Sequence, residues 1–396
     1  MHTATALSPE DVAAGIVAAT RAVVGPRDGF VPLHEPEFRG RERDYVSDCV
    51  DTGWVSSVGN YVDRIETDLA RITGVKRAVA TANGTAALHI CLLLAGVVPG
   101  DEVLIPALTF VATANAVAYC DAVPHFVDSE AISLGVDAAK LDAHLRDIAV
   151  VEDGVCRNRT TGAPIRALVV MHVFGHPSDL DALAAVAERW HVALIEDAAE
   201  SLGSSYRGVH TGNRGVVSAL SFNGNKLVTT GGGGAILTND EALGARAKHL
   251  TTTARVAHRW NFVHDEMGYN YRMPNLNAAL GCAQLERLDD MLARKRVLAE
   301  RYAAAFAEVA GATVLPEPEG TQSNYWLNAI LLSPEAAGAR DAVLDALNSA
   351  GLMARPVWTL MHRLPMYATA PRADLSVAED LEARVINLPS SPILVD

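Results

Sequence analysis

Short apolar runs alternate with amphipathic segments through the first two-thirds of the chain. The apolar runs predict buried strands, and the segments of helical periodicity between them predict covering helices. Alternation of this kind is typical of an α/β domain in which helices cover both faces of a mostly parallel sheet. The predicted strands are 77–81, 102–106, 123–127, 167–170, 192–196 and 217–222, and the predicted helices are 85–95, 111–119 and 182–190.

Turn and cap residues mark two further segments. Ser8 followed by Pro9 predicts the N-cap and first turn of a helix near the start of the chain. An Asp-Gly dipeptide at 153–154 and a Thr-Gly dipeptide at 161–162 surround short polar runs. This spacing predicts a small surface hairpin within 155–165.

The last third of the chain has a different pattern. A long stretch of helical periodicity covers 277–309, and shorter apolar and helical segments follow it. They indicate a smaller α+β domain that is joined to the first by a long helix. We therefore expect three parts: an N-terminal helical extension at 1–30, a large α/β domain at 31–275, and the linking helix with the small domain at 276–396.

Charge and cysteine usage exclude several classes of protein. The formal net charge is −14, from 33 Lys and Arg against 47 Asp and Glu, and no basic run occurs. Nucleic-acid binding is therefore not expected, because phosphate contacts need clustered basic residues. The five cysteines are scattered without a CxxC pair, so neither a metal site nor a disulfide framework is expected.

The scattered cysteines and the absence of a targeting pattern together predict a cytoplasmic protein. Arg21 interrupts the apolar stretch near the N-terminus, and that stretch lacks the basic start of a secretory signal. No apolar run reaches the length of about 18 residues that a membrane-spanning helix needs. We expect no membrane partner.

Two polar segments follow predicted strands. Thr81 to Leu88 reads TANGTAAL, so Gly84 and Thr85 lie where a helix begins, and unpaired backbone N–H groups at such an end favour an anion. The alternative is an ordinary helix cap. Asp197, in EDAAES, ends an apolar strand, where ligands of open α/β sheets collect. A helix cap is the alternative here as well.

A third segment carries a candidate nucleophile. Lys226 ends SFNGNK after a predicted strand and precedes TTGGGG, whose glycines allow close backbone approach. A lysine amine reacts with a carbonyl once it loses its proton, which desolvation promotes. A solvated surface lysine is the alternative. The fourth segment, GYNYRM at 268–273, is by itself only a polar turn with aromatic residues.

In this order, NGTAAL, EDAAES, SFNGNK with TTGGGG, and GYNYRM resemble the DegT/StrS sugar-nucleotide aminotransferases. The resemblance extends from 32 to 392. It implies a fold-type I pyridoxal-phosphate enzyme, with a mostly parallel seven-stranded sheet in the large domain. It also implies pyridoxal 5′-phosphate as cofactor, with pyridoxamine 5′-phosphate formed during turnover, and a homodimer with shared active sites.

The resemblance also implies roles for individual residues. Lys226 matches the lysine that bonds the cofactor, and Asp197 matches the carboxylate that pairs with its pyridine nitrogen. Gly84, Thr85 and Ser221 match the phosphate cradle, while Asn270 matches an asparagine that reaches the partner subunit's phosphate. Phe110 matches an aromatic stacked on the ring, with core packing as the alternative. Two positions stay open: Glu200, where relatives often carry Gln or His near the ring hydroxyl, and His172, which can serve structure or chemistry.

Three segments resemble a subgroup of the family more closely. They are PLHEPEFRG at 32–40, GWVSSVG at 53–59 and the hairpin at 155–165. This likeness to the legionaminic-acid and bacillosamine-type enzymes implies a UDP-linked 2-acetamido-4-keto-6-deoxyhexose as acceptor and its 4-amino sugar as product. The resemblance to the whole family implies glutamate as amino donor. Aromatic faces pack on sugar carbons and polar groups bond ring oxygens. The sugar-side candidates are Trp54, Ser56, Ser57, Tyr325, Trp326 and His362, and the diphosphate candidates are Arg259 and Arg272, each with packing, solvation or a salt bridge as the alternative.

Other functions on this fold need different residues. A sugar 3-dehydratase of the family replaces the lysine with histidine, so Lys226 argues against that activity. An aminotransferase for a 3-keto sugar, a cyclitol or an aromatic precursor would keep Lys226 and change only the pocket. A non-catalytic protein on the same fold is the last alternative, and the retention of Asp197, Lys226 and the phosphate cradle argues against it.

Overall fold

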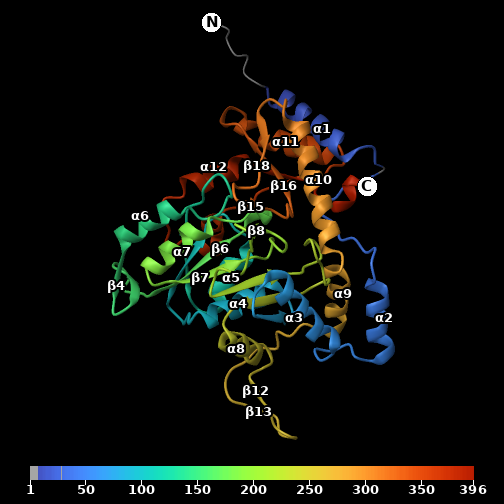
Figure 1. The fold of residues 1–396 in the computed structure, drawn as a ribbon. Coiled ribbons are helices and arrows are strands. Elements are labelled where there is room, and N and C mark those ends of the chain that lie inside the picture. The colour runs from blue at the N-terminus through green and yellow to red at the C-terminus, as the bar shows by residue number, and fades with distance from the viewer. Residues whose placement is uncertain (1–7, 28) are drawn as a thin grey trace.

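A computed structural model describes residues 8–27 and 29–396 (Figure 1). Its central feature is a seven-stranded sheet in the order β1-β11-β10-β7-β6-β2-β3. Only β11 runs antiparallel to its two neighbours, so the predicted mostly parallel α/β fold is confirmed. The strands are β1 (Arg77–Thr81), β2 (Glu102–Pro106), β3 (Val123–Val127), β6 (Ile165–Met171), β7 (Ala193–Asp197), β10 (Val217–Ser221) and β11 (Gly234–Thr238).

Both faces of this sheet are covered because alternate strand residues point to opposite sides. Val103, Val169 and Ile195 belong to one core cluster, which includes the apolar sides of helices α4, α5 and α8. Their neighbours Leu104 and Leu168 belong to a second cluster on the other face. The covering helices are α4 (Gly84–Leu94), α5 (Val111–Tyr119) and α8 (Glu241–Thr251) on the first face, and α6 (Ala138–Ile148), α7 (Leu180–Arg189) and α3 (Asn60–Thr73) on the second.

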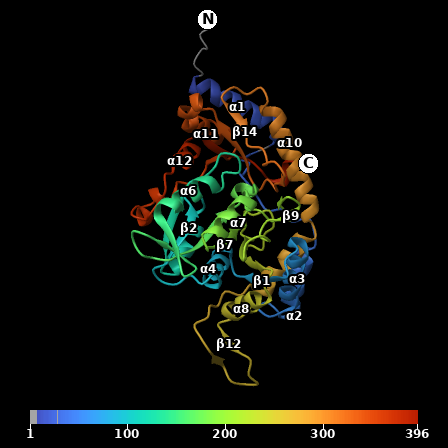
Figure 2. The ribbon, with the colours of Figure 1, turned by 60° about the vertical axis from the view of Figure 1, so that its left-hand side comes forward.

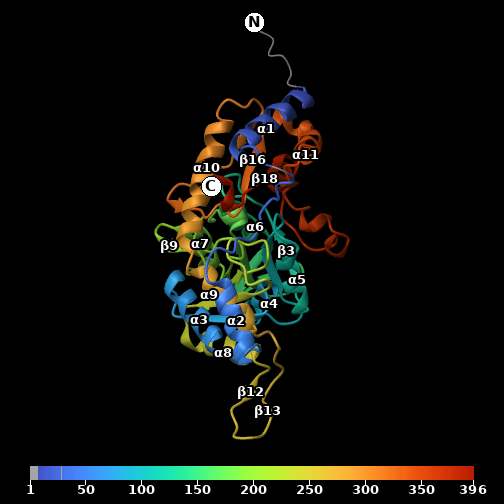
Figure 3. The ribbon, with the colours of Figure 1, turned by 90° about the vertical axis from the view of Figure 1, so that its right-hand side faces the viewer.

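A second, antiparallel sheet lies in the C-terminal part of the chain. Its order is β14-β16-β18-β17, and helices α1, α10 and α11 pack against it. All three views show these helices at one end of the molecule (Figures 1, 2 and 3). The elements are α1 (Pro9–Val24), α10 (Leu288–Phe306), α11 (Arg340–Ser349), α12 (Ser376–Arg384), β14 (Ala312–Val314), β16 (Asn328–Leu332), β17 (Arg355–Pro356) and β18 (Val385–Leu388).

The single helix predicted at 277–309 is two helices in the structure. Helix α9 (Asn275–Leu285) ends before α10 begins, and Arg287 between them has a φ of −108° and a ψ of 6°, outside helical geometry. Arg287 donates to Glu37 at 2.6 Å, a contact with a distant segment that helical periodicity cannot reveal. The boundaries at 30 and 275 stay a prediction, and residues 1–7 and 28 of the N-terminal extension lie outside the described residues.

Ser8 caps α1 as predicted, because its hydroxyl accepts a hydrogen bond from the Asp11 amide. The predicted surface hairpin forms earlier in the chain, between β4 (Ala149–Glu152) and β5 (Val155–Asn158). Its turn contains the Asp-Gly dipeptide at 153–154, where both residues have positive φ. The remaining elements are α2 (Glu42–Thr52), β8 (Ser205–Tyr206), β9 (Val209–His210), β12 (Arg255–Val256), β13 (Val263–His264), β15 (Thr321–Gln322) and the short 3-10 helices Val173–Gly175, Pro334–Ala339, Met361–Arg363, Pro365–Tyr367 and Pro392–Val395.

The hairpin of β12 and β13 projects from the body at the end opposite α1 (Figures 1, 2 and 3). Trp260 and Phe262 in this hairpin and Met267 just after it are 67, 76 and 81% exposed. Exposed apolar side chains that form a contiguous patch mark interaction surfaces. Within 8–27 and 29–396, no helix has the length and apolar character that crossing a membrane requires.

Glu196 joins the end of β7 to the loop that precedes β10. Its buried carboxylate accepts hydrogen bonds from His172 Nε2 at 2.9 Å and from the backbone amides of Gly212, Arg214 and Gly215 at 2.7 to 2.8 Å. Burial alone would raise the pKa of Glu196, but these donors outweigh burial and lower it. The ionised carboxylate is therefore part of the folded state.

We predict that Glu196→Ala lowers the free energy of unfolding by about 3–5 kcal/mol, because it leaves several buried donors unpaired. Urea denaturation followed by circular dichroism measures this. Since the pKa is lowered in the fold, the stabilisation is complete above the ordinary value of 4.5 and fades as the pH falls below it. The control is Glu188→Ala on the exposed side of α7; equal losses in the two variants would contradict the prediction.

Candidate active site

A cavity of about 320 Å³ opens where β7 and β10 end and α4 begins. This is the carboxyl edge of the parallel strands, where open α/β sheets bind ligands. It brings together eight of the residues singled out from the sequence: Gly84, Thr85, Phe110, Asp197, Glu200, Ser221, Lys226 and Trp326. The other lining residues are Asn83, Leu88, Ala112, Met171, Ala199, Asn223, Asn225 and Trp358.

One end of the cavity is built for an anion. Asn83 caps α4 by accepting the Ala86 amide at 2.8 Å, and the earlier amides of the helix lack helical partners. A Cβ on Gly84 would lie 2.8 Å from the Ser221 Cβ, so only glycine allows this close approach of α4 to β10. Backbone amides and the hydroxyls of Thr85 and Ser221 can therefore surround a phosphate.

Asp197 is a buried carboxylate at the end of β7. Thr113 Oγ1 donates to its Oδ2 at 2.7 Å, and the Ala199 amide donates to its Oδ1 at 3.2 Å. Burial raises the pKa of Asp197, although these hydrogen bonds and the Lys226 charge oppose the shift. A cationic ring nitrogen beside this carboxylate would offset its desolvation. Thr113, which bonds Thr109 at 2.9 Å, was not predicted from the sequence.

Lys226 meets an acid and an aromatic ring in the same cavity. Its Nζ lies 3.0 Å from Glu200 Oε1 and 3.6 Å from the centre of the Trp326 ring, and its side chain is 14% exposed. Trp326 is held by a hydrogen bond from its Nε1 to the Asn225 carbonyl at 2.7 Å. The amine is therefore largely shielded from water while it stays open to the cavity.

The cavity mouth is aromatic. Phe110 is 50% exposed, and its ring centre lies 6.3 Å from that of Trp358. Trp358 follows β17 and packs on Phe174 at 5.2 Å, so the C-terminal part of the chain supplies one wall of the site. Sequence reasoning missed Trp358, because no local pattern at 356–358 distinguishes it from a packing residue.

His172 lies behind the cavity and does not line it. Its Nδ1 accepts the Ser178 amide at 3.1 Å, so Nε2 carries the proton and donates to Glu196 at 2.9 Å. Both ring nitrogens are thus engaged within the protein. This geometry supports the structural one of its two predicted roles.

The remaining sequence candidates lie outside this cavity. Trp54 and Ser56 belong to an exposed loop beside α9, where Asn275 donates to both of their carbonyls, and Ser57 follows them. Tyr325 packs on His176 with ring centres 5.4 Å apart, and His362 lies 3.4 Å from Glu379. Asn270 is exposed, and its backbone pairs with that of Thr252 at the end of α8. Arg259 lies over Trp260 within the hairpin of β12 and β13, and the Arg272 backbone pairs with that of Thr81 at the end of β1.

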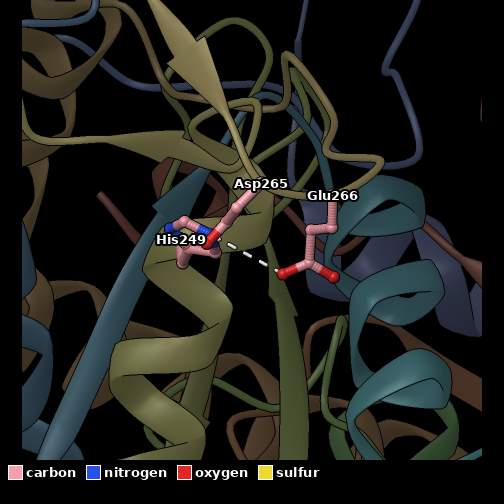
Figure 4. A group of neighbouring side chains, drawn as sticks. All are labelled: His249, Asp265 and Glu266. Carbon is pink, nitrogen blue, oxygen red and sulfur yellow. Dashed lines mark hydrogen bonds and ion pairs between the residues drawn. The ribbon is translucent and has the colours of Figure 1, made fainter.

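Figure 4 shows the group His249, Asp265 and Glu266, where α8 meets the segment after β13. Their ligand atoms lie within 4.8 Å of one another, which a metal ion could bridge. The charges are already paired, however. His249 Nε2 lies 2.7 Å from Asp265 Oδ1, and Arg246 donates to both Glu266 oxygens. The group accounts for how the projecting hairpin is anchored on α8.

Comparison with known proteins agrees with this geometry. GDP-perosamine synthase of Escherichia coli O157:H7 is 37% identical over 365 residues, which are 92% of this chain and 94% of that protein. GDP-perosamine synthase of Caulobacter vibrioides is 38% identical and covers 91% of this chain and 93% of its own length. The crystal structure of the aminotransferase TlmJ from Streptoalloteichus hindustanus superposes with a TM-score of 0.82 at 29% identity, covering 91% of this chain and 94% of that chain.

A family model gives the same assignment over most of the chain. The model of the DegT/DnrJ/EryC1/StrS aminotransferases matches residues 36–396. The match includes every segment that lines the cavity. The chain belongs to the DegT/DnrJ/EryC1/StrS aminotransferase family and is a pyridoxal-phosphate-dependent sugar aminotransferase.

Proposed function

We propose that Lys226 bonds the cofactor covalently and that the enzyme transfers an amino group from glutamate to a nucleotide-linked keto sugar. One observation carries the proposal. The Lys226 amine, the Asp197 carboxylate and the start of α4 line one cavity. These are the three groups that a phosphorylated pyridine aldehyde requires: an amine for the aldehyde, an anion for the ring nitrogen and donors for the phosphate.

The cavity residues fit this cofactor. Gly84 allows the start of α4 to approach Ser221 closely, so the helix amides and the Thr85 and Ser221 hydroxyls can face one phosphate. Asp197 has a buried carboxylate to pair with a protonated ring nitrogen. Phe110 would stack on the ring. When bound, pyridoxal phosphate supplies an electron-withdrawing ring that stabilises negative charge on the substrate carbon.

Lys226 would also move protons. Once the donor displaces it, the free Nζ lies in the cavity beside Glu200 and can carry a proton between two carbon positions. Trp326, 5% exposed, excludes water from one side of the amine. The keto sugar then receives the amino group through the same proton transfers in reverse.

Asp197 should be needed for its charge rather than for its shape. We predict that Asp197→Asn lowers kcat by about 10²-fold or more, whereas Asp197→Glu loses less, because only a carboxylate holds the ring proton in place. Single-turnover absorbance changes with glutamate measure the first half-reaction directly. The matched control is Thr113→Val, which removes one hydrogen bond and keeps the charge. A near-normal rate in Asp197→Asn would exclude this role.

The acceptor is the finer part of the proposal. The segments at 32–40, 53–59 and 155–165 support a UDP-linked 2-acetamido-4-keto-6-deoxyhexose, which would become its 4-amino sugar. A GDP-linked sugar is the second candidate, because two relatives at 37 and 38% identity are named GDP-perosamine synthase. Both candidates carry a diphosphate and a sugar ring, which we place near the exposed Phe110 and near Trp358.

A substrate panel separates the candidates. Keto sugars made in place by 4,6-dehydratases from UDP-, GDP- and dTDP-hexoses are incubated with glutamate and enzyme, and products are identified by mass spectrometry. We expect an amino sugar from the UDP-linked 4-keto compound. Turnover of the GDP-linked compound alone would show that the nucleotide is GDP and not UDP. Turnover of only a 3-keto sugar would overturn the position of amination, while the aminotransferase assignment would stand.

We also propose that the enzyme is a homodimer with shared active sites. In the described part of the chain no arginine lines the cavity. Among the described residues, Lys226 is the one basic residue in its lining, which also contains the acidic Asp197 and Glu200. A nucleotide diphosphate therefore needs cations from elsewhere. Asn275 at the start of α9 donates to the Trp54 and Ser56 carbonyls, and Asn270 and Arg272 lie a few residues before it in the chain. The exposed apolar hairpin lies just before them.

Mixing experiments test the shared site. Lys226→Ala and Asn270→Ala are each expected to be inactive or severely impaired. A heterodimer of the two would contain one site with neither change. We predict that random exchange at equal concentrations restores about one quarter of wild-type activity. Lys226→Ala mixed with Asp197→Asn is the control, since both changes lie in each subunit's own cavity and no intact site forms. No recovery with Asn270→Ala would contradict sharing, as would recovery in the control.

A further inference from the structure

Glu200 gives each of its two carboxylate oxygens a separate partner. Oε1 lies 3.0 Å from Lys226 Nζ, and Oε2 accepts the Phe174 backbone amide at 2.9 Å. The side chain is 2% exposed. One oxygen is therefore fixed to the backbone, and the other faces the amine that reacts.

The amide that fixes Glu200 comes from a strained residue. Phe174 has a φ of 56° and a ψ of 14°, a left-handed conformation that costs a residue with a side chain about 1 kcal/mol or more. Its ring is 1% exposed and packs on Trp358, which holds the residue in place. Strain of this kind persists where the surrounding structure enforces it, and here it directs an N–H at Glu200.

One side-chain amide joins the backbone of Glu200 to that of Trp326, whose ring also contacts Lys226. Asn324 Nδ2 donates to the Glu200 carbonyl at 2.9 Å, and Asn324 Oδ1 accepts the Trp326 amide at 2.8 Å. Asn324 is 1% exposed, and a Cβ on Gly175 would lie 1.9 Å from its Oδ1. The acid and the aromatic ring that flank Nζ are therefore held by one buried group.

We propose that Glu200 is the proton acceptor and donor for Lys226. The inference rests on the proposed role of Lys226. In the forward direction the Nζ–H bond of the ammonium breaks, the proton forms a bond to Glu200 Oε1, and a neutral amine faces a neutral carboxylic acid. The neutral amine keeps the electron pair with which it can bond the cofactor aldehyde or accept a proton from carbon. The acid returns the proton when Lys226 is protonated again.

Asp197 is less suited to this role, although it lines the same cavity. Both of its oxygens already accept donors, from Thr113 and from the Ala199 amide. Glu200 directs Oε1 at Nζ, and burial raises its pKa, which favours a carboxyl that can hold a proton. Exchange between an ion pair and a neutral pair also suits a site with little water, because neither form leaves an isolated charge.

Capture of the cofactor by the apoenzyme tests the proposal. Pyridoxal phosphate is added to apoenzyme, and the visible absorbance of the bound cofactor is followed by stopped flow. Glu200→Gln keeps the shape of the side chain but cannot take up the proton. We expect capture and the glutamate half-reaction to slow by about 10²-fold. Glu188→Gln, on the exposed side of α7, is the matched control and should behave as wild type.

Chemical rescue separates proton transfer from a structural role. Glu200→Ala opens space beside Nζ, and acetate should accelerate both rates in proportion to its concentration, whereas chloride at equal ionic strength should not. Equal capture rates in Glu200→Gln and wild type, or no acceleration by acetate, would overturn the proposal. If Glu200→Ala does not fold, Glu200→Gln decides alone. Failure of Lys226 to bond the cofactor in the wild-type enzyme would instead refute the proposed function.

Discussion

Three buried carboxylates at the end of one strand are the constraint around which the site is built. Glu196, Asp197 and Glu200 are at most 4% exposed, and an unpaired buried charge costs several kcal/mol. The protein compensates each one differently. Loop amides and His172 surround Glu196, which fixes the loop before β10. Lys226 compensates Glu200, and Asp197 is left with neutral donors only, facing the cavity.

Because the three carboxylates have different partners, the segment 196–200 can serve both the stability of the fold and the chemistry of the site. Glu196 points away from the cavity and holds the fold, while Asp197 points into it, since adjacent strand residues face opposite sides. Glu200 lies beyond the strand end, where the strained Phe174 and the buried Asn324 position it. The strain and the buried charges are concentrated where a ligand and a reactive amine must be oriented.

The sequence predicted the parts of the site that follow strands. Gly84, Asp197 and Ser221 each lie at an element boundary, and Lys226 lies in the loop after β10; parallel strands bring such positions to one edge. Contacts between distant segments could not be predicted. Thr113, Phe174, Asn324 and Trp358 have no local signal, because their roles depend on packing between elements. The break near Arg287 was missed for the same reason. Trp54, Asn270 and Arg259 lie outside the cavity.

The most direct measurement of the central claim is the position of the covalent cofactor. The holoenzyme is reduced with borohydride and digested, and the labelled peptide is sequenced by mass spectrometry. Lys226 lies in the cavity with Asp197 and the start of α4. Lys295, by contrast, is fully buried, and its Nζ donates hydrogen bonds to the Trp326 and Ser390 carbonyls. The account predicts one label, on Lys226. A label on Lys295 or on any other lysine would contradict it.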